Sequence, residues 1–230
     1  MTEQRAYKSI VFDLDGVIVR GSHTHPSVYR DAATRAVEEL GVADCSDDDL
    51  DVLGHPVDVD GAVGRCRDLG IDPEEFWRLR EAAASRIEND QIRRGERDLY
   101  DDVSTLSNLD ATLGIVSNNR QQTVEFIIDW FSLERDFDVW LGRDETVGGF
   151  ERMKPDPHYI HRALNSLDVA AERTLYVGDR ESDIVAARNA GTDAAYLLRT
   201  HNHEDSFSRE PTYVLSGLDE LQEYENGTQK

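Results

Sequence analysis

The sequence predicts an α/β protein built on a doubly wound parallel sheet. Short apolar runs, typical of strands buried on both faces, alternate with longer stretches of helical periodicity. The strand-like runs are SIVFD (9–13), ATLGIVS (111–117), TLYVGD (174–179), AAYLLR (194–199) and TYVLS (212–216). Alternation of strands and helices favours a parallel sheet, because each parallel crossover needs room for a helix.

Three helices are predicted between these later strands. The segment 119–131 follows the second strand directly. The segment 155–167 opens on a proline, which suits the first turn of a helix. The segment 181–191 ends on Gly191, which suits a C-terminal cap.

The interval between the first two strands is too long for a single crossover. It holds about 95 residues, whereas a crossover with its helix needs a dozen or more. We interpret residues 21–95 as an inserted α-helical cap domain, and residues 1–20 and 96–230 as the α/β core. The insert is predicted to contain helices over 26–41, 58–70 and 72–90. An insert at this point would lie over the carboxyl end of the first strand, where open α/β sheets bind ligands.

The overall charge excludes several classes of partner. The 230-residue chain has a net charge of −22 and a pI near 4.5, which argues against nucleic acid or an anionic membrane as partner. We expect a cytoplasmic protein, because there is no apolar run of about 18 residues and no signal-peptide pattern. Cys45 and Cys66 lack metal-ligand spacing and are expected to be reduced thiols.

Lysine is scarce in this chain. Only Lys8, Lys154 and Lys230 are present, while acidic residues are spread along every helix. Diffuse acidity with little lysine suggests a halophilic protein, in which salt screens the self-repulsion of the chain. The scarcity also marks Lys154 as a candidate functional residue.

Two aspartates follow the first strand directly. Asp13 and Asp15 stand two residues apart, so they share a face of an extended strand and could converge on one site. Buried carboxylates are costly unless they are paired, hydrogen-bonded or bound to metal. The alternative is a solvated loop in which Asp15 and Gly16 form an ordinary turn.

Polar residues also follow the second strand. Ser117 and Asn118 precede a predicted helix, where a hydroxyl and backbone N–H groups can bind phosphate. The alternative is a helix cap, a position that both residue types favour. Lys154 precedes the proline-initiated helix and could extend its ammonium over the strand ends; otherwise it is a solvated surface lysine.

A second acidic pair follows the third strand. Asp179 ends the strand, and Asp183 lies one helical turn beyond it. Two acids at a strand end suit Mg²⁺, which is bound by one or two carboxylates together with water and substrate phosphate. The alternative is a helix start enriched in acids that complement the helix dipole.

Taken together, these motifs resemble the haloacid dehalogenase-like (HAD) hydrolase superfamily. The resemblance covers residues from about 10 to 200 and rests on FDLDGV, VSNN, KPDP and VGDRESD, in the order that the superfamily uses. The insert looks like a helical cap of the first type, and the general resemblance is to phosphoglycolate phosphatase-like members. It implies a Rossmann-like core.

The resemblance also implies a mechanism. Asp13 matches the nucleophile that forms an aspartyl-phosphate, and Asp15 matches the general acid and base. Mg²⁺ would be bound by Asp13, the backbone carbonyl of Asp15, Asp179 and Asp183. The phosphoryl oxygens would be held by Ser117, the Asn118 amide and Lys154, with Gly16 allowing close approach of the backbone. Dehalogenases of the superfamily lack an aspartate at the position of Asp15, so phosphate chemistry is favoured.

The expected enzyme is a phosphoric monoester hydrolase that acts on a small phosphorylated metabolite, such as phosphoglycolate or a sugar phosphate. Alternatives are a phosphomutase of the same superfamily and a non-catalytic binding member. Within the predicted cap domain, Arg65 and His55 could contact substrate, but Arg65 is more readily interpreted as a surface residue. The oligomeric state is not readable from the sequence.

Overall fold

The computed structural model describes residues 7–21, 24–54, 59–202 and 207–225. Within these ranges the chain forms one six-stranded sheet in the order β3-β2-β1-β4-β5-β6, and every pairing is parallel. The strands are β1 (Ser9–Phe12), β2 (Thr112–Arg120), β3 (Val139–Arg143), β4 (Thr174–Gly178), β5 (Asp193–Leu197) and β6 (Tyr213–Leu215). The predicted α/β fold with a doubly wound parallel sheet is confirmed.

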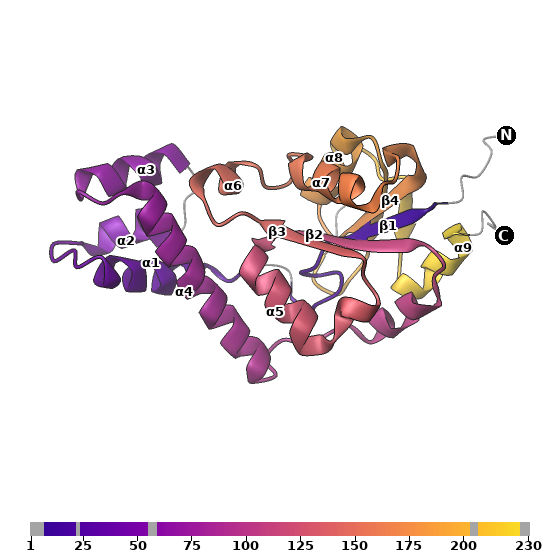
Figure 1. The fold of residues 1–230 in the computed structure, drawn as a ribbon, viewed down its shortest axis with the longest axis horizontal. Coiled ribbons are helices and arrows are strands. Elements are labelled where there is room, and N and C mark those ends of the chain that lie inside the picture. The colour runs from indigo at the N-terminus through magenta and orange to yellow at the C-terminus, as the bar shows by residue number, and fades with distance from the viewer. Residues whose placement is uncertain (1–6, 22–23, 55–58, 203–206, 226–230) are drawn as a thin grey trace.

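Helices cover the sheet and form a separate group beside it (Figure 1). The α-helices are α1 (Pro26–Glu39), α2 (Asp47–Gly54), α3 (Val59–Asp68), α4 (Pro73–Arg93), α5 (Gln121–Phe131), α6 (Val147–Glu151), α7 (His158–Leu167), α8 (Glu181–Ala190) and α9 (Leu221–Glu225). The 3₁₀ segments are η1 (Asp101–Asn108), η2 (Leu133–Arg135), η3 (Ala171–Arg173) and η4 (Leu218–Glu220).

Some elements differ from the sequence prediction. The edge strand β3 was not predicted; its residues are only partly buried at the start, so they lack the continuous apolar run of a central strand. Helix α5 begins two residues later than predicted, because β2 continues to Arg120 and pairs there with Arg143. Helix α7 begins at His158, so Pro155 precedes the helix instead of opening it.

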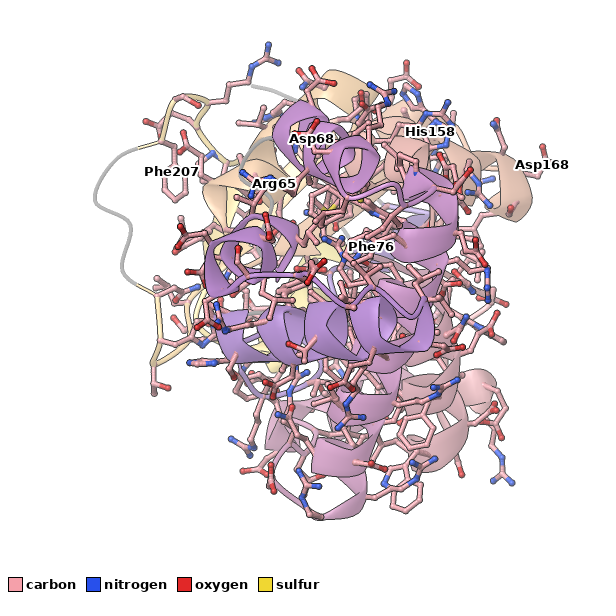
Figure 2. The ribbon with its side chains drawn as sticks, turned by 90° about the vertical axis from the view of Figure 1, so that its left-hand side faces the viewer. Arg65, Asp68, Phe76, His158, Asp168 and Phe207 are labelled. Atoms are coloured by element: carbon pink, nitrogen blue, oxygen red, sulfur yellow. The ribbon has the colours of Figure 1, made fainter. Side chains whose placement is uncertain are left out.

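Helices α1–α4, here called the helical insert, have a core of their own. One cluster of buried side chains includes Phe76, Trp77 and Leu53, and a smaller one joins α1 to α4. The sheet is covered by two other clusters, one on each face. Figure 2 views the molecule from the side of the insert, with Phe76 among its helices and Arg65 and Asp68 on α3.

The insert is joined to the sheet by a buried group of charges. Glu81, on α4, is fully buried and accepts hydrogen bonds from three arginines: Arg80 on the same helix, Arg120 at the end of β2 and Arg143 at the end of β3. A second α4 carboxylate, Glu88, accepts from Arg120 Nη1 at 2.9 Å. Because breaking a buried ion pair leaves an uncompensated charge, these contacts oppose separation of α4 from the strands.

Candidate active site

The order of the strands brings the predicted motifs to one edge of the sheet. β1 lies between β2 and β4, and Phe12 is level with Ile115 and Val177 in its two neighbours. The residues that follow these positions therefore emerge side by side. Asp13 is anchored there by its backbone N–H, which donates to the Val177 carbonyl oxygen at 2.9 Å.

Three carboxylates meet at this edge. One oxygen from each of Asp13, Asp179 and Asp183 lies within 4.8 Å of the others, and all three residues are buried. Asp13 comes from the end of β1, Asp179 from the end of β4, and Asp183 from the first turn of α8. Asp183 also helps to cap α8, because its Oδ2 accepts from the Arg180 N–H at 3.1 Å.

Lys154 supplies one cation to this acidic cluster. Its ammonium lies 2.8 Å from Asp13 Oδ1 and 2.7 Å from Asp183 Oδ1, and it is 5% exposed. It also donates to the Tyr176 hydroxyl at 2.8 Å and to the Val116 carbonyl at 3.1 Å. The solvated alternative for this lysine is therefore wrong: its side chain reaches under the strand ends.

The clustering changes the proton affinities of the acids. Burial raises the pKa of Asp13 to about 7, and the neighbouring Asp183 acts in the same sense against the lowering effect of Lys154. Burial, with Asp13 and Asp183 nearby, raises the pKa of Asp179 to about 8. Burial alone would lower the pKa of Lys154, but the attraction of Asp13 and Asp183 outweighs it and raises that pKa.

The donor set fits a hard divalent cation. Two of the three buried carboxylates share the Lys154 ammonium and the third contacts the His201 ring, so the cluster carries more negative than positive charge when its acids are ionised. The buried Asp179 Oδ1 has no hydrogen-bond partner among the described residues. Carboxylate oxygens at a strand end are the ligands that Mg²⁺ prefers, and a cation there would offset the excess charge. The cluster therefore has the residues to hold a metal ion.

Asp15 is near this cluster but has different partners. Its Oδ1 forms an ion pair with Arg97, and its Oδ2 accepts from Asn119 Nδ2 at 3.0 Å. Its carboxylate is not part of the group of three, so Asp13 and Asp15 have different side-chain partners, and their convergence on one site stays a prediction. Burial alone would raise the pKa of Asp15, but Arg97 and Asn119 outweigh it and lower that pKa.

Gly16 allows Asp179 to approach the turn after β1. Its φ is +88°, and a Cβ added at this position would lie 2.2 Å from Asp179 Oδ2. An L side chain is disfavoured at such a φ, and here the carboxylate leaves no space for one. The observed neighbour of Gly16 is therefore Asp179, one of the three clustered carboxylates, while the predicted contact of Gly16 with phosphate stays a prediction.

Ser117 and Asn118 lie at the same edge of the sheet, and the side chain of each is hydrogen-bonded to the backbone of another residue. Ser117 is buried, and its hydroxyl accepts from the Asn119 N–H at 3.0 Å. The Asn118 side chain holds Lys154 at both backbone groups: Nδ2 donates to the Lys154 carbonyl at 3.2 Å, and Oδ1 accepts from the Lys154 N–H at 2.7 Å. Neither residue is the cap of α5, since Arg120 is.

Four residues of this site were not predicted from the sequence. Asn119 and Arg97 hold Asp15, Tyr176 contacts Lys154, and His201 Nε2 lies 2.6 Å from Asp179 Oδ2. Asn119 follows the recognised Asn118 directly and is the last residue of VSNN, so its place in the motif was an available signal. Tyr176 lies in the predicted strand TLYVGD, where it was taken only as a buried strand residue. Arg97 and His201 come from segments without a motif, so no local pattern pointed to them.

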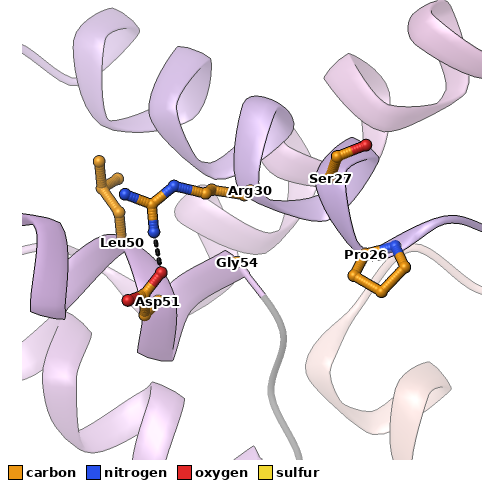
Figure 3. Close-up of a pocket in the computed structure, with 6 residues that line it drawn as sticks. All are labelled: Pro26, Ser27, Arg30, Leu50, Asp51 and Gly54. Atoms are coloured by element: carbon orange, nitrogen blue, oxygen red, sulfur yellow. Dashed lines mark ion pairs between the residues drawn. The ribbon is translucent and has the colours of Figure 1, made fainter.

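A separate pocket lies on the helical insert (Figure 3). Pro26, Ser27, Arg30, Leu50, Asp51 and Gly54 line it. Arg30 is neutralised by Asp47 and Asp51, so the pocket offers no free positive charge to a phosphate. Arg65 likewise pairs with Asp49 inside the insert. His55 lies outside the described residues.

The chain matches a protein family over most of its length. The match covers residues 10–197, and the family is described as haloacid dehalogenase-like hydrolase. The chain belongs to this family. The predicted superfamily and Rossmann-like core are confirmed, and so is the prediction that the chain is an enzyme of the phosphatase class.

Two curated relatives cover almost the whole chain. A phosphoglycolate phosphatase of Vibrio cholerae is 30% identical over 226 residues, which is 95% of this chain and 97% of that protein. Pyrophosphatase PpaX of Anoxybacillus flavithermus is 29% identical over 226 residues, which is 93% of this chain and 94% of that protein. The predicted phosphoglycolate phosphatase-like character is confirmed by the first of these.

Solved structures share the fold. CbbY from Rhodobacter sphaeroides, crystallised in complex with phosphate, superposes with a TM-score of 0.64 at 20% identity, covering 94% of this chain and 96% of that one. A HAD phosphatase from Thermococcus onnurineus gives a TM-score of 0.60 at 21% identity, covering 97% and 100%. Among the described residues no helix is long and apolar enough to cross a membrane.

Proposed function

We propose that the protein is a Mg²⁺-dependent phosphatase that hydrolyses a small phosphate ester through a phosphorylated Asp13. The observation that carries this proposal is the position of Asp13. It is buried at the end of β1, in contact with Lys154 and within 4.8 Å of two further carboxylates. Splitting the displacement into two steps replaces one difficult reaction by two easier ones.

In the first step an Asp13 oxygen forms a bond to phosphorus and the bond to the leaving oxygen breaks. The protonated form of Asp15, a minority at neutral pH because its pKa is lowered, gives its proton to that oxygen, which departs as an alcohol. In the second step Asp15 takes a proton from water, the water oxygen bonds to phosphorus, and the bond from phosphorus to Asp13 breaks. Asp15 is two residues from Asp13, so it is suited to serve both steps.

Asp13, Asp179 and Asp183 would hold Mg²⁺ together with the backbone carbonyl of Asp15. When bound there, the cation supplies positive charge that offsets the acids and the phosphoryl oxygens. Lys154, the Ser117 hydroxyl and the Asn118 amide would bind the phosphoryl oxygens, with Gly16 leaving room at the turn. Fixed donors of this kind stabilise charge that develops in the transition state.

The substrate we propose is a small metabolite, phosphoglycolate-like or a sugar phosphate. Residues 21–95 would act as a cap domain that closes over the carboxylates and excludes water. The relative from Vibrio cholerae is named for phosphoglycolate, PpaX for pyrophosphate, and CbbY was crystallised with xylulose-1,5-bisphosphate. All three names point to compact phosphorylated compounds.

The test uses p-nitrophenyl phosphate with Mg²⁺, with and without EDTA, and compares Asp13→Asn with wild type. Asp129→Asn, an exposed acid on α5, is the matched control. We expect EDTA and Asp13→Asn each to abolish turnover, and mass spectrometry of quenched wild type to find one phosphoryl group on Asp13. Equal turnover by Asp13→Asn and wild type would refute the proposal.

A panel of phosphorylated metabolites, assayed at several KCl concentrations, then identifies the substrate. Glucose-1-phosphate in that panel separates phosphatase from phosphomutase. Release of inorganic phosphate supports hydrolysis, whereas formation of an isomeric sugar phosphate would replace it by the mutase alternative.

A further inference from the structure

The chain enters and leaves the helical insert along two adjacent segments. Val19 forms a bridge with Leu99, the Arg20 N–H donates to the Asp98 carbonyl at 2.8 Å, and the Tyr100 N–H donates to the Ile18 carbonyl at 3.0 Å. Asp15 is tied to the first of these segments, because it too forms a bridge with Val19. The turn that carries Asp15 is thus attached to the place where residues 18–20, which lead into the insert, pair with residues 98–100, which lead out of it.

Arg97 directly precedes the outgoing segment 98–100, and its side chain extends to Asp15 in the candidate active site. Its Nη2 forms an ion pair with Asp15 Oδ1, and its Nε donates to the Arg20 carbonyl at 3.2 Å. Its Nη1 lies 3.9 Å from Glu88 Oε1 of helix α4. The side chain is 13% exposed. One guanidinium therefore contacts the candidate acid, the incoming segment and the insert.

The partners of Arg97 are themselves held in place. Glu88 is 1% exposed and also accepts from Arg120 at the end of β2. On the other side, Asn119 fixes the second oxygen of Asp15 at 3.0 Å. The Asp15 carboxylate is thus held at both oxygens by donors from two different segments. Removing Arg97 would leave one oxygen of a buried carboxylate without its charged partner.

We propose that Arg97 is a positioning residue that orients the Asp15 carboxylate toward the leaving oxygen of the substrate. The inference rests on the proposed function in one respect, the role of Asp15 in moving a proton to that oxygen. A proton donor must lie within hydrogen-bond reach of the atom that it serves, so loss of orientation slows the step. The effect depends on the leaving group, because a good one departs without a proton.

The experiment compares kcat/KM for an alkyl ester, glycerol 2-phosphate, with kcat/KM for p-nitrophenyl phosphate, whose leaving group is good. This parameter covers only the steps up to departure of the leaving group. The variants are Arg97→Met, Arg97→Lys and Asp15→Asn. Arg94→Met is the matched control, since Arg94 is in the same segment but exposed and paired with Glu96.

We expect Arg97→Met to lower the alkyl-to-aryl ratio of kcat/KM about tenfold or more, which is a part of the roughly 10²–10⁴-fold that general acid–base catalysis contributes. Arg97→Lys, which keeps the charge without the fork of donors, should lower the ratio less, and Arg94→Met should leave it unchanged. Equal losses on both substrates, or a ratio that stays constant or rises, would overturn the inference.

Circular dichroism and thermal melting establish whether each variant is folded. If Arg97→Met does not fold, Arg97→Lys decides by the same criterion. The Asp15→Asn variant separates this inference from the proposed function. If Asp15→Asn leaves the ratio unchanged, the role of Asp15 is wrong; if it lowers the ratio and the Arg97 variants do not, the positioning role of Arg97 is wrong.

Discussion

The ammonium of Lys154 lies 2.8 Å from Asp13 Oδ1 and 2.7 Å from Asp183 Oδ1, so one buried cation links the end of β1 to the first turn of α8. The side chain of Asn118 holds the backbone of the same lysine. The position of this ammonium is therefore set by contacts with β1, β2 and α8 together. Removing it would leave Asp13 and Asp183 without the ammonium that both of them contact.

We expect Lys154→Met to lower kcat by about 10²–10³-fold, because it removes a fixed donor that would face the charged transition state. The measurement is steady-state turnover of p-nitrophenyl phosphate with saturating Mg²⁺. Lys8→Met, an exposed lysine before β1, is the control and should be fully active. A loss of less than tenfold in Lys154→Met would contradict a role for this ammonium in the reaction.

Mg²⁺ should stabilise the folded protein through Asp179. A ligand at 100 times its Kd that binds only the folded state adds about 2.7 kcal/mol to the free energy of unfolding. Thermal melts with and without Mg²⁺ should therefore differ for wild type, and the difference should vanish in Asp179→Asn. Asp129→Asn should keep it. Equal Mg²⁺ stabilisation of wild type and Asp179→Asn would show that the cation binds elsewhere.

The close approach of Gly16 and Asp179 can be separated from backbone strain. Gly16→Ala places an L residue at a positive φ and also brings its Cβ into collision with Asp179. Gly70→Ala places an L residue at a positive φ without a collision, since a Cβ there meets nothing within 4 Å. We expect the strain of an L residue at a positive φ to lower the free energy of unfolding of each variant by about 1–2 kcal/mol. Only Gly16→Ala should also lose phosphatase activity; similar activity in both would argue against displacement of Asp179.

The free energy of unfolding should depend on pH through the buried Glu81. Burial alone would raise its pKa, but Arg143, Arg80 and Arg120 outweigh burial and hold that pKa below its ordinary value. A carboxyl whose pKa is lower in the folded state than in the unfolded state stabilises the protein at pH values above the unfolded pKa, which is about 4.3 for Glu. This stabilisation is lost progressively as the pH falls from there toward the folded pKa.

The free energy of unfolding of Glu81→Gln should therefore be about 3–5 kcal/mol lower than that of wild type at pH 7, as expected when one partner of a buried ion pair is removed. The difference should shrink as the pH falls below about 4. Urea denaturation at pH 7 and pH 3 measures both effects, with the exposed Glu75→Gln of the same helix as control. A difference that does not change with pH would contradict the ionised state of Glu81.

The predicted halophilic character concerns the whole chain, with its net charge of −22. Screening by salt weakens repulsion between like charges, so the melting temperature should rise between low and molar KCl. A melting temperature that is the same at both concentrations would refute the prediction.

Local patterns predicted the sheet and the principal acidic residues. Asp13 and Asp179 follow apolar runs that are buried as parallel strands, and parallel strands bring their carboxyl ends to the same edge. The edge strand β3 escaped prediction because only its last residues are buried. The start of α5 was misplaced because pairing with β3 extends β2, and such pairing is not encoded in one segment.

The fold class, the order of the motifs and the acids at strand ends follow from the sequence, because hydrophobic periodicity and strand termini are local properties of the chain. The cation that each acid meets depends instead on contacts between distant segments. Arg97 pairs with Asp15 across 82 residues, and Glu81 meets Arg143 across 62. In a chain with 47 acidic and 25 basic residues, ion pairs at such separations depend on how the insert packs against the sheet.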